Sequence, residues 1–163
     1  NAKYIISQTG CDAVKIEGGK KIIKIIKHLV ENKVQVMGHV GLLPQSEKGK
    51  FSFKGKTEIE KKRIFNDAKL LVSAGVFSIV LECTEKFLAQ KITSSIKIPT
   101  IGIGASAYCD GQILVTDDLL GLNSVNYRFV KKYANLTKII DKAARNFKQD
   151  VIKKLFPKKK NLY

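Results

Sequence analysis

The apolar run VFSIVL at residues 76–81 decides the fold class of this chain. It is short, rich in β-branched residues and apolar at successive positions, which is typical of a strand buried on both faces of a parallel sheet. A helical pattern precedes it. Thr57 and Glu60 have the T-x-x-E spacing of a capping box, and the apolar positions that follow share one helix face up to Gly75. A helix followed by a buried strand predicts an α/β unit.

The same alternation extends in both directions from this unit. Thr84 is expected to cap the next helix, and residues 41–56 are expected to form a long loop of the kind that usually has a function. Because strands and helices alternate, we expect a parallel sheet. No linker divides the chain, so we expect a single domain, 1–163. The predicted elements are strands at residues 12–17, 34–40, 76–81, 98–103 and 113–115, and helices at residues 20–31, 57–75, 84–95 and about 127–155.

Charge is the most unusual feature of the composition. The chain has 30 basic and 14 acidic residues and a net charge of +16. Strongly basic domains often bind nucleic acids, but proteins that do so favour arginine for its bidentate geometry. Only Arg63, Arg128 and Arg145 are arginines. We therefore interpret the excess as lysine drift, as in an AT-biased genome, and do not expect nucleic-acid binding. The lysine-rich end is expected to be solvated, with an interaction tail as the alternative.

The cysteines and the apolar runs limit where the protein works. Cys11, Cys83 and Cys109 form no C-x-x-C pair and are odd in number, so we expect free thiols and a reducing, cytoplasmic location. Neither histidine has zinc-ligand spacing from a cysteine. No apolar run approaches the ~18 residues of a membrane span, so no membrane partner is expected.

Candidate site residues stand at the ends of the predicted strands, where parallel α/β folds build their active sites. Lys15 and Glu17 share one face of the first strand, two residues apart. His39 ends the second strand, and Glu82 directly follows the third. A carboxylate in that position is suited to act as a base. Three alternatives stay open: a structural Lys15–Glu17 ion pair, a packing role for His39, and a surface position for Glu82.

Residues 102–107, GIGASA, match the G-x-G-x-x-A form of the dinucleotide fingerprint. That motif must open a helix, whereas the following YCDGQ is turn-like. Too little chain follows for the rest of a Rossmann sheet. We therefore do not expect a nicotinamide cofactor.

Taken together, the strand-end stretches resemble the ketopantoate hydroxymethyltransferase (3-methyl-2-oxobutanoate hydroxymethyltransferase) family. The matching stretches are AVKIEGG (13–19), VMGHVGLLPQS (36–46), DA (67–68) with AGVFSIVLE (74–82), IPTIGIGAS (98–106), CDGQILVTDDLLG (109–121) and RFVKKYANL (128–136). The resemblance implies a (β/α)8 TIM barrel, of which this chain would hold the fourth to eighth βα units. The N-terminal units, with two metal-binding aspartates and a substrate-binding serine, are then expected to be absent from this chain, which begins at Asn1 rather than at a methionine.

The resemblance also implies roles for the strand-end residues. Glu82 is similar to the family's catalytic base, Lys15 and His39 to its substrate-binding residues, and Glu17 to the carboxylate at its Mg²⁺ centre. There are two departures from the family pattern. Ser106 replaces the last glycine of GIGAG, which is expected to perturb the backbone near the site. The proline expected soon after Glu82 is missing, which is expected to change only the start of a helix.

The implied reaction moves a hydroxymethyl group from 5,10-methylenetetrahydrofolate to 3-methyl-2-oxobutanoate through a Mg-stabilised enolate. The product is 2-dehydropantoate, a precursor of pantothenate and coenzyme A. The resemblance thus implies a cytoplasmic, folate-dependent transferase that binds a 2-oxo acid and forms a homodecamer. The alternatives are an incomplete, non-catalytic remnant of that enzyme and a basic nucleic-acid-binding protein.

Overall fold

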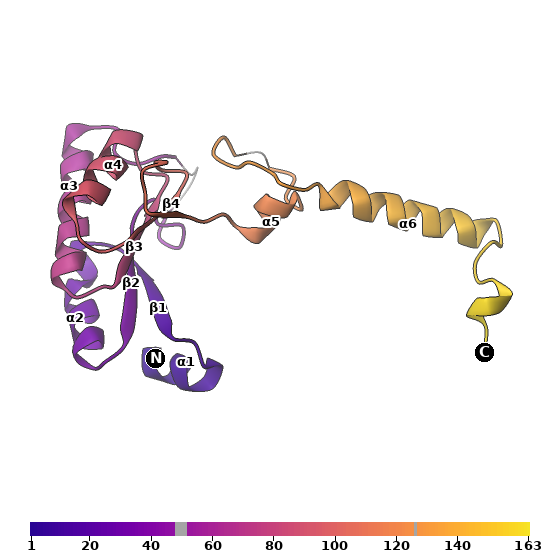
Figure 1. The fold of residues 1–163 in the computed structure, drawn as a ribbon, viewed down its shortest axis with the longest axis horizontal. Coiled ribbons are helices and arrows are strands. Elements are labelled where there is room, and N and C mark those ends of the chain that lie inside the picture. Colours follow the sequence, from indigo (N-terminus) through magenta and orange to yellow (C-terminus); the bar gives the residue numbers. More distant parts are fainter. Residues whose placement is uncertain (48–51, 126) are drawn as a thin grey trace. The chain divides into compact units, whose positions relative to one another are not determined.

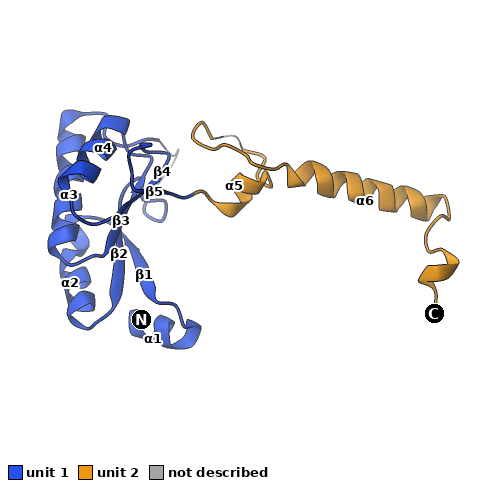
Figure 2. Ribbon diagram, in the orientation of Figure 1, with its two compact units in different colours: residues 1–113 blue, residues 114–163 orange. Residues whose placement is uncertain are grey.

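The computed structural model describes residues 1–47, 52–125 and 127–163 (Figure 1). They form two compact units, residues 1–113 and residues 114–163 (Figure 2). Within the described ranges, none of the helices combines the length and apolarity needed to cross a membrane.

The first unit alternates strands and helices. Its elements are α1 (Ala2–Thr9), β1 (Ala13–Glu17), the 3-10 helix η1 (Lys20–Ile22), α2 (Ile23–Glu31), β2 (Gln35–Gly41), α3 (Glu58–Ser73), β3 (Ser78–Glu82), α4 (Lys86–Ser95), β4 (Thr100–Ile103) and β5 (Gly111–Gln112). The second unit contains α5 (Thr116–Leu120), α6 (Leu136–Ile152) and the 3-10 helix η2 (Lys159–Asn161).

The five strands form one parallel sheet in the order β1-β2-β3-β4-β5. Every neighbour in the sheet is also the next strand in the chain. A doubly wound sheet reverses its strand order part-way, whereas a barrel adds each strand to the same edge. The predicted α/β class with a parallel sheet is confirmed, and the strand order is consistent with part of a TIM barrel.

Helices α2, α3 and α4 lie on one side of this sheet (Figure 1). The hydrophobic core fills the space between them, because alternate strand residues point to this side. Its fully buried members include Ile26 of α2, Leu71 of α3, Ile79 and Leu81 of β3, and Ile92 of α4.

At one glycine of β2, a side chain of α3 packs directly against the strand. A Cβ atom on Gly38 would lie 2.9 Å from Cδ1 of Leu71, closer than real Cβ contacts allow. A side chain at this position would therefore force the end of the Leu71 side chain to shift. Gly38 leaves the space on β2 into which this side chain of α3 packs.

The helix starts differ in detail from the sequence expectations. Thr57 caps α3, as predicted, and its Oγ1 accepts a hydrogen bond from the Glu60 N–H at 3.2 Å. The Glu60 carboxylate, however, accepts from the amides of Gly55 and Lys56, further upstream than a capping box requires. The expected cap at Thr84 is wrong. Glu85 caps α4, because its two carboxylate oxygens accept from two successive helix amides.

Three further boundaries differ from the predictions. The strand expected at residues 113–115 is wrong: β5 comprises residues 111–112, because pairing with β4 ends there and the chain turns into α5. The last helix is shorter than expected and starts at Leu136, where the Asn135 side chain caps it. Helix α1 was not predicted. In the expected loop at 41–56, residues 48–51 lie outside the described residues.

A carboxylate ties the start of β4 to the turn before β5. Oδ2 of Asp110 accepts hydrogen bonds from the backbone N–H of Thr100 at 2.8 Å and from its hydroxyl at 3.0 Å. The Thr100 hydroxyl also lies 2.8 Å from that of Thr93 on α4. The hydrogen bond from the Thr100 amide, followed by that from its hydroxyl, lowers the pKa of Asp110.

We expect this carboxylate to make stability depend on pH. A carboxyl group whose pKa is lower in the folded protein stabilises the fold above its unfolded pKa, and that contribution is lost as the pH falls through the folded value. Thermal unfolding of wild-type protein should therefore shift to lower temperature below about pH 4. Asp110→Asn should show a smaller shift over the same range, with Asp12→Asn as the exposed-loop control. Equal pH dependence in Asp110→Asn and wild type would contradict the assignment.

Candidate active site at the carboxyl edge of the sheet

Strand register brings three of the four predicted site residues together. Glu17 of β1 pairs with His39 of β2, and Glu82 of β3 pairs with Gly41, two residues beyond His39. Residues two apart on a strand, and partners in register across strands, point to the same face of the sheet. Glu17, His39 and Glu82 therefore share the face opposite α2, α3 and α4, at the carboxyl ends of their strands.

His39 lies between the two carboxylates. Its side chain is completely buried, with Nδ1 3.8 Å from Oε1 of Glu17 and Nε2 3.3 Å from Oε2 of Glu82. Neither ring nitrogen has a hydrogen-bond partner of good geometry among the described residues. Buried polar atoms are normally satisfied, so the two nitrogens of His39 leave hydrogen-bonding capacity that the described residues do not fill. The packing interpretation and the substrate-contact interpretation of His39 both remain open on this geometry.

The two carboxylates are held near the surface, within reach of a ligand. The side chains of Glu17 and Glu82 are 10% and 16% exposed. Oε2 of Glu17 also accepts a hydrogen bond from the Gln45 amide at 3.2 Å, which ties the end of β1 to the segment after β2. The alternative of a freely exposed surface Glu82 is wrong.

Lys15 lies on the same face but does not join this group. It is exposed and pairs in register with Met37, one pleat before the Glu17–His39 pair. Within the described ranges, the ion pair recorded for Glu17 is with His39, and none joins it to Lys15. The alternative of a structural Lys15–Glu17 ion pair is therefore not observed. The Lys15 ammonium stays exposed on the site face.

The backbone that carries Glu82 is held in an unusual conformation. Cys83 has φ +43°, in the left-handed region that non-glycine residues seldom adopt. Gly41 has φ +96°, and a Cβ there would overlap the Glu82 carbonyl oxygen, which accepts from the Leu42 amide at 2.8 Å. Such strained residues cluster at functional sites. Burial, and next the Glu82 charge, raises the pKa of the Cys83 thiol to about 11, so it stays protonated at neutral pH.

The far arm of the loop after β2 reaches the same place, which the sequence did not indicate. The Lys54 amide donates to the Cys83 carbonyl at 2.7 Å, and the Lys54 carbonyl accepts from the Glu85 amide at 2.8 Å. The Lys54 ammonium pairs with Glu47 at 2.8 Å. Glu60 holds the next two amides of this arm, each at 2.9 Å. The strand end that bears Glu82 is thus hydrogen-bonded to both ends of one loop.

Ser106, where the family pattern has a glycine, has an ordinary φ. It is buried, and its Oγ accepts a hydrogen bond from the Tyr108 amide at 3.3 Å. The positive φ of this segment falls at Gly104. The expected effect of Ser106 on the site stays a prediction. Residues 102–107 lead into turns and β5 rather than a helix, as the turn-like YCDGQ stretch predicts.

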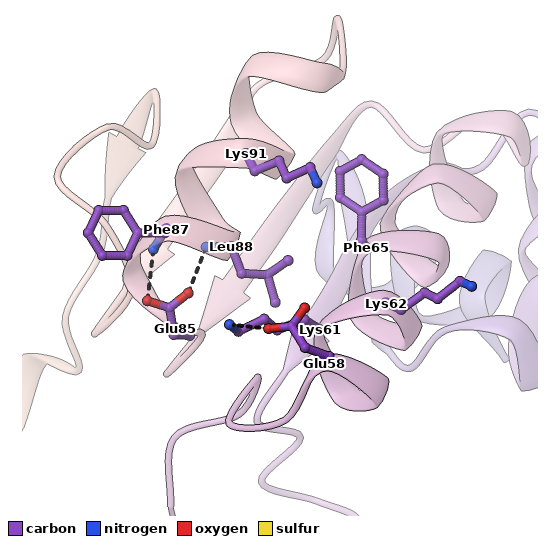
Figure 3. Close-up of a pocket in the computed structure, with 8 residues that line it drawn as sticks. All are labelled: Glu58, Lys61, Lys62, Phe65, Glu85, Phe87, Leu88 and Lys91. Atoms are coloured by element: carbon purple, nitrogen blue, oxygen red, sulfur yellow. Dashed lines mark hydrogen bonds and ion pairs between the residues drawn. The ribbon is translucent and has the colours of Figure 1, made fainter.

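Two hollows lie in the first unit, and of the four predicted site residues Glu17 alone is among the described residues that line one of them. A cleft of about 960 Å³ is lined by Glu17, the turn at residues 18–21, and Glu47, Lys54 and Asp67 among others. A smaller groove of about 480 Å³ lies between α3 and α4 (Figure 3). Two of its acidic groups already have partners: Glu58 pairs with Lys61, and Glu85 caps α4. It contains none of the predicted site residues.

The described residues do not form a complete metal site. Carboxylate oxygens are the ligands that Mg²⁺ prefers, and Glu17 offers one such group. Among the described residues, however, no group of three or more histidine, cysteine or acidic side chains is arranged to hold a metal ion. The imidazole of His39 separates Glu17 from Glu82. The three cysteines are free, as predicted.

Comparison with protein families matches residues 1–159 to the family described as ketopantoate hydroxymethyltransferase. The chain belongs to this family. The family's curated members include proteins named 3-methyl-2-oxobutanoate hydroxymethyltransferase from Pelagibacter ubique and Hyphomonas neptunium. The first is 62% identical to this chain over 163 residues, and the second is 48% identical to it over 159 residues. Membership confirms the resemblance seen in the strand-end motifs.

The chain spans only part of these family members. It covers 63% of the Pelagibacter ubique protein and 58% of the Hyphomonas neptunium protein, while 100% and 96% of the chain are matched. A relative from Pelodictyon phaeoclathratiforme, with the same name, is 45% identical over 160 residues and is covered to 58% of its length.

The Glu60 contacts can be tested by removing the carboxylate. Glu60→Ala leaves the amides of Gly55 and Lys56 without an acceptor, so the arm at 54–56 should loosen and the free energy of unfolding should fall by about 1–2 kcal/mol. Hydrogen exchange should accelerate in peptides covering residues 53–56 and 83–85. The matched control is Glu58→Ala, which removes an exposed carboxylate two residues earlier on the same helix. Unchanged exchange at 83–85 in Glu60→Ala would show that the arm does not hold this strand end.

Burial works to raise the pKa of Glu60, but the amides of Lys56 and Gly55 and the charges of Arg63 and Lys54 outweigh it, so the pKa is lowered. A lowered pKa means that the ionised carboxylate stabilises the fold and that this contribution fades in acid. The difference in stability between wild type and Glu60→Ala should therefore shrink below about pH 4.

Proposed function

We propose that this chain carries the proton-abstracting part of a 3-methyl-2-oxobutanoate hydroxymethyltransferase active site. The observation that supports this most directly is the convergence of Glu17, His39 and Glu82 on one face, at the carboxyl edge of a parallel sheet, in a member of this family. A buried imidazole between two partly exposed carboxylates is suited to binding a small polar substrate and moving a proton.

In the proposed reaction, Glu82 takes the proton from C3 of 3-methyl-2-oxobutanoate, and the electron pair left behind forms the enolate. Lys15 offsets the negative charge of the substrate carboxylate, and His39 contacts the substrate beside Glu82. Water hydrolyses the two C–N bonds that hold the one-carbon unit on 5,10-methylenetetrahydrofolate, which leaves tetrahydrofolate and the carbon at the oxidation level of formaldehyde. The enolate carbon then adds to that carbon, whose oxygen takes up the proton held by Glu82 and becomes the hydroxyl group of 2-dehydropantoate.

Glu17 is proposed as a ligand of Mg²⁺ that is completed by groups outside this chain. When bound, the ion supplies Lewis-acid stabilisation of the charge that develops on the substrate's oxo oxygen. Because the described residues offer no complete metal site, the proposal requires further carboxylates from the part of the family members that this chain does not match.

The proposed complete fold is a (β/α)8 TIM barrel in which this chain forms the fourth to eighth units. The consecutive parallel strand order supports it, as does a share of 58–63% of the relatives' length. A homodecamer is proposed from the family resemblance. The three free thiols support the proposed cytoplasmic location.

The base assignment is tested by exchange of the C3 proton for deuterium. The assay uses this chain together with the part of the Pelagibacter ubique relative that it does not match, in the presence of Mg²⁺. Glu82→Gln should lower the exchange rate by at least about 100-fold, while calorimetry still detects binding of the 2-oxo acid. Glu31→Gln, at the end of α2, should exchange at the wild-type rate. Normal exchange in Glu82→Gln would refute Glu82 as the base.

The same experiment separates the enzyme from the remnant. If the assembled protein is folded and binds neither Mg²⁺ nor the 2-oxo acid, and wild type shows no exchange, this chain is a non-catalytic remnant. Restored exchange supports the proposed function.

A further inference from the structure

Two motifs from the sequence, the paired glycines after Glu17 and the DA dipeptide at 67–68, have no part in the proposed reaction. The structure brings them together. Oδ1 of Asp67, on α3, accepts a hydrogen bond from the backbone N–H of Lys20 at 2.8 Å. A Cβ atom on Gly19 would overlap the Asp67 carboxyl group. The carboxylate thus occupies the space that any side chain at position 19 would need.

The turn held in this way is bonded directly to the candidate site. The Gly18 amide donates to the carbonyl of His39 at 3.0 Å, immediately after the in-register pair of Glu17 and His39. The turn is therefore fixed on one side by the backbone of His39 and on the other by Asp67.

Helix α3 supplies a rigid support for Asp67. The next residue, Ala68, is completely buried, as is Leu71. Leu71 packs against β2 where Gly38 lacks a side chain. Asp67 is therefore held on a helix seated on the strand that carries His39, and its carboxylate reaches across to the end of the strand that carries Glu17.

We propose that Asp67 is a positioning residue of the site. By holding the turn at residues 18–20, it sets the place of Glu17 relative to His39. The inference rests on the proposed function only for the use of the site, since the hydrogen bond and the close approach exist whatever the reaction is.

The position of His39 can be measured without any activity. The chain has only two histidines, and His28 lies exposed on α2, so its imidazole signals serve as an internal reference for those of His39 in NMR spectra. Asp67→Ala should shift the His39 ring signals and leave those of His28 in place. Asp67→Asn should restore them, because the amide oxygen can still accept from Lys20. Asn66→Ala, the neighbouring exposed position on α3, should shift neither.

The close approach at Gly19 gives a second test, which also serves if Asp67→Ala does not fold. Gly19→Ala should lower the Tm and shift the His39 signals in wild type, because the added methyl collides with the Asp67 carboxyl group. In the Asp67→Ala background, where that group is missing, the same substitution should lower the Tm by a smaller amount. Equal losses in both backgrounds would show that the two residues are independent.

Three results would overturn the inference. The first is unchanged His39 signals in a folded Asp67→Ala or Gly19→Ala variant. The second is an equal shift in Asn66→Ala, and the third is a failure of Asp67→Asn to restore the signals. In the deuterium-exchange assay, Asp67→Ala should lower the rate by roughly 10-fold. If Asp67→Ala shifts the His39 signals but the wild-type protein shows no deuterium exchange, the inference stands and the proposed function is refuted. If Asp67→Ala leaves the His39 signals unshifted and the wild-type protein exchanges normally, the proposed function stands and the inference is refuted.

Discussion

The site depends on the parallel register of β1, β2 and β3. Pairing of Glu17 with His39, and of Gly41 with Glu82, puts one imidazole between two carboxylates. Because the side-chain period of a strand is two, a slip of one residue in either pair would turn a carboxylate toward the helices and bury it in the core. The apolar residues on the other face prevent that slip, since Val36, Val40, Ile79 and Leu81 would then leave the core. The same hydrophobic pattern that forms the sheet therefore fixes the site.

Glycines allow neighbouring elements to come close to the ends of these three strands. Gly38 admits Leu71 of α3, Gly19 leaves room for Asp67, and Gly41 passes beside the Glu82 carbonyl oxygen. At Gly41 the positive φ adds a conformational reason for glycine. The contacts at Gly38 and Gly19 join the ends of β2 and β1 to α3, and the contact at Gly41 joins the end of β2 to that of β3. This interpretation explains why the backbone at Cys83 remains in a strained conformation, since it is hydrogen-bonded on both sides.

Local patterns in the sequence predicted most of the fold and four site residues, of which Glu17, His39 and Glu82 come together and Lys15 stays apart. Hydrophobic periodicity predicts the strands and α2–α4. Glu17, His39 and Glu82 were predicted because active sites of parallel sheets lie at the carboxyl ends of the strands. What the sequence did not show depends on pairing across long separations. Asp67 and Lys20 are 47 residues apart, and the arm at Lys54 is joined to Cys83 by backbone atoms that carry no residue-specific signal. The predictions for the cap of α4 and for the bounds of β5 were wrong because neighbouring residues fit each sequence pattern equally well. Only the contacts in the folded chain decide between them.

We propose that the 2-oxo acid binds at the Glu17–His39–Glu82 edge of the sheet. A crystal structure of the chain, assembled with the unmatched part of its Pelagibacter ubique relative and soaked with 3-methyl-2-oxobutanoate and Mg²⁺, tests it most directly. We expect electron density for the 2-oxo acid within hydrogen-bonding distance of His39, with its C3 carbon facing the Glu82 carboxylate. Density in the groove between α3 and α4, with this edge free of substrate, would contradict it.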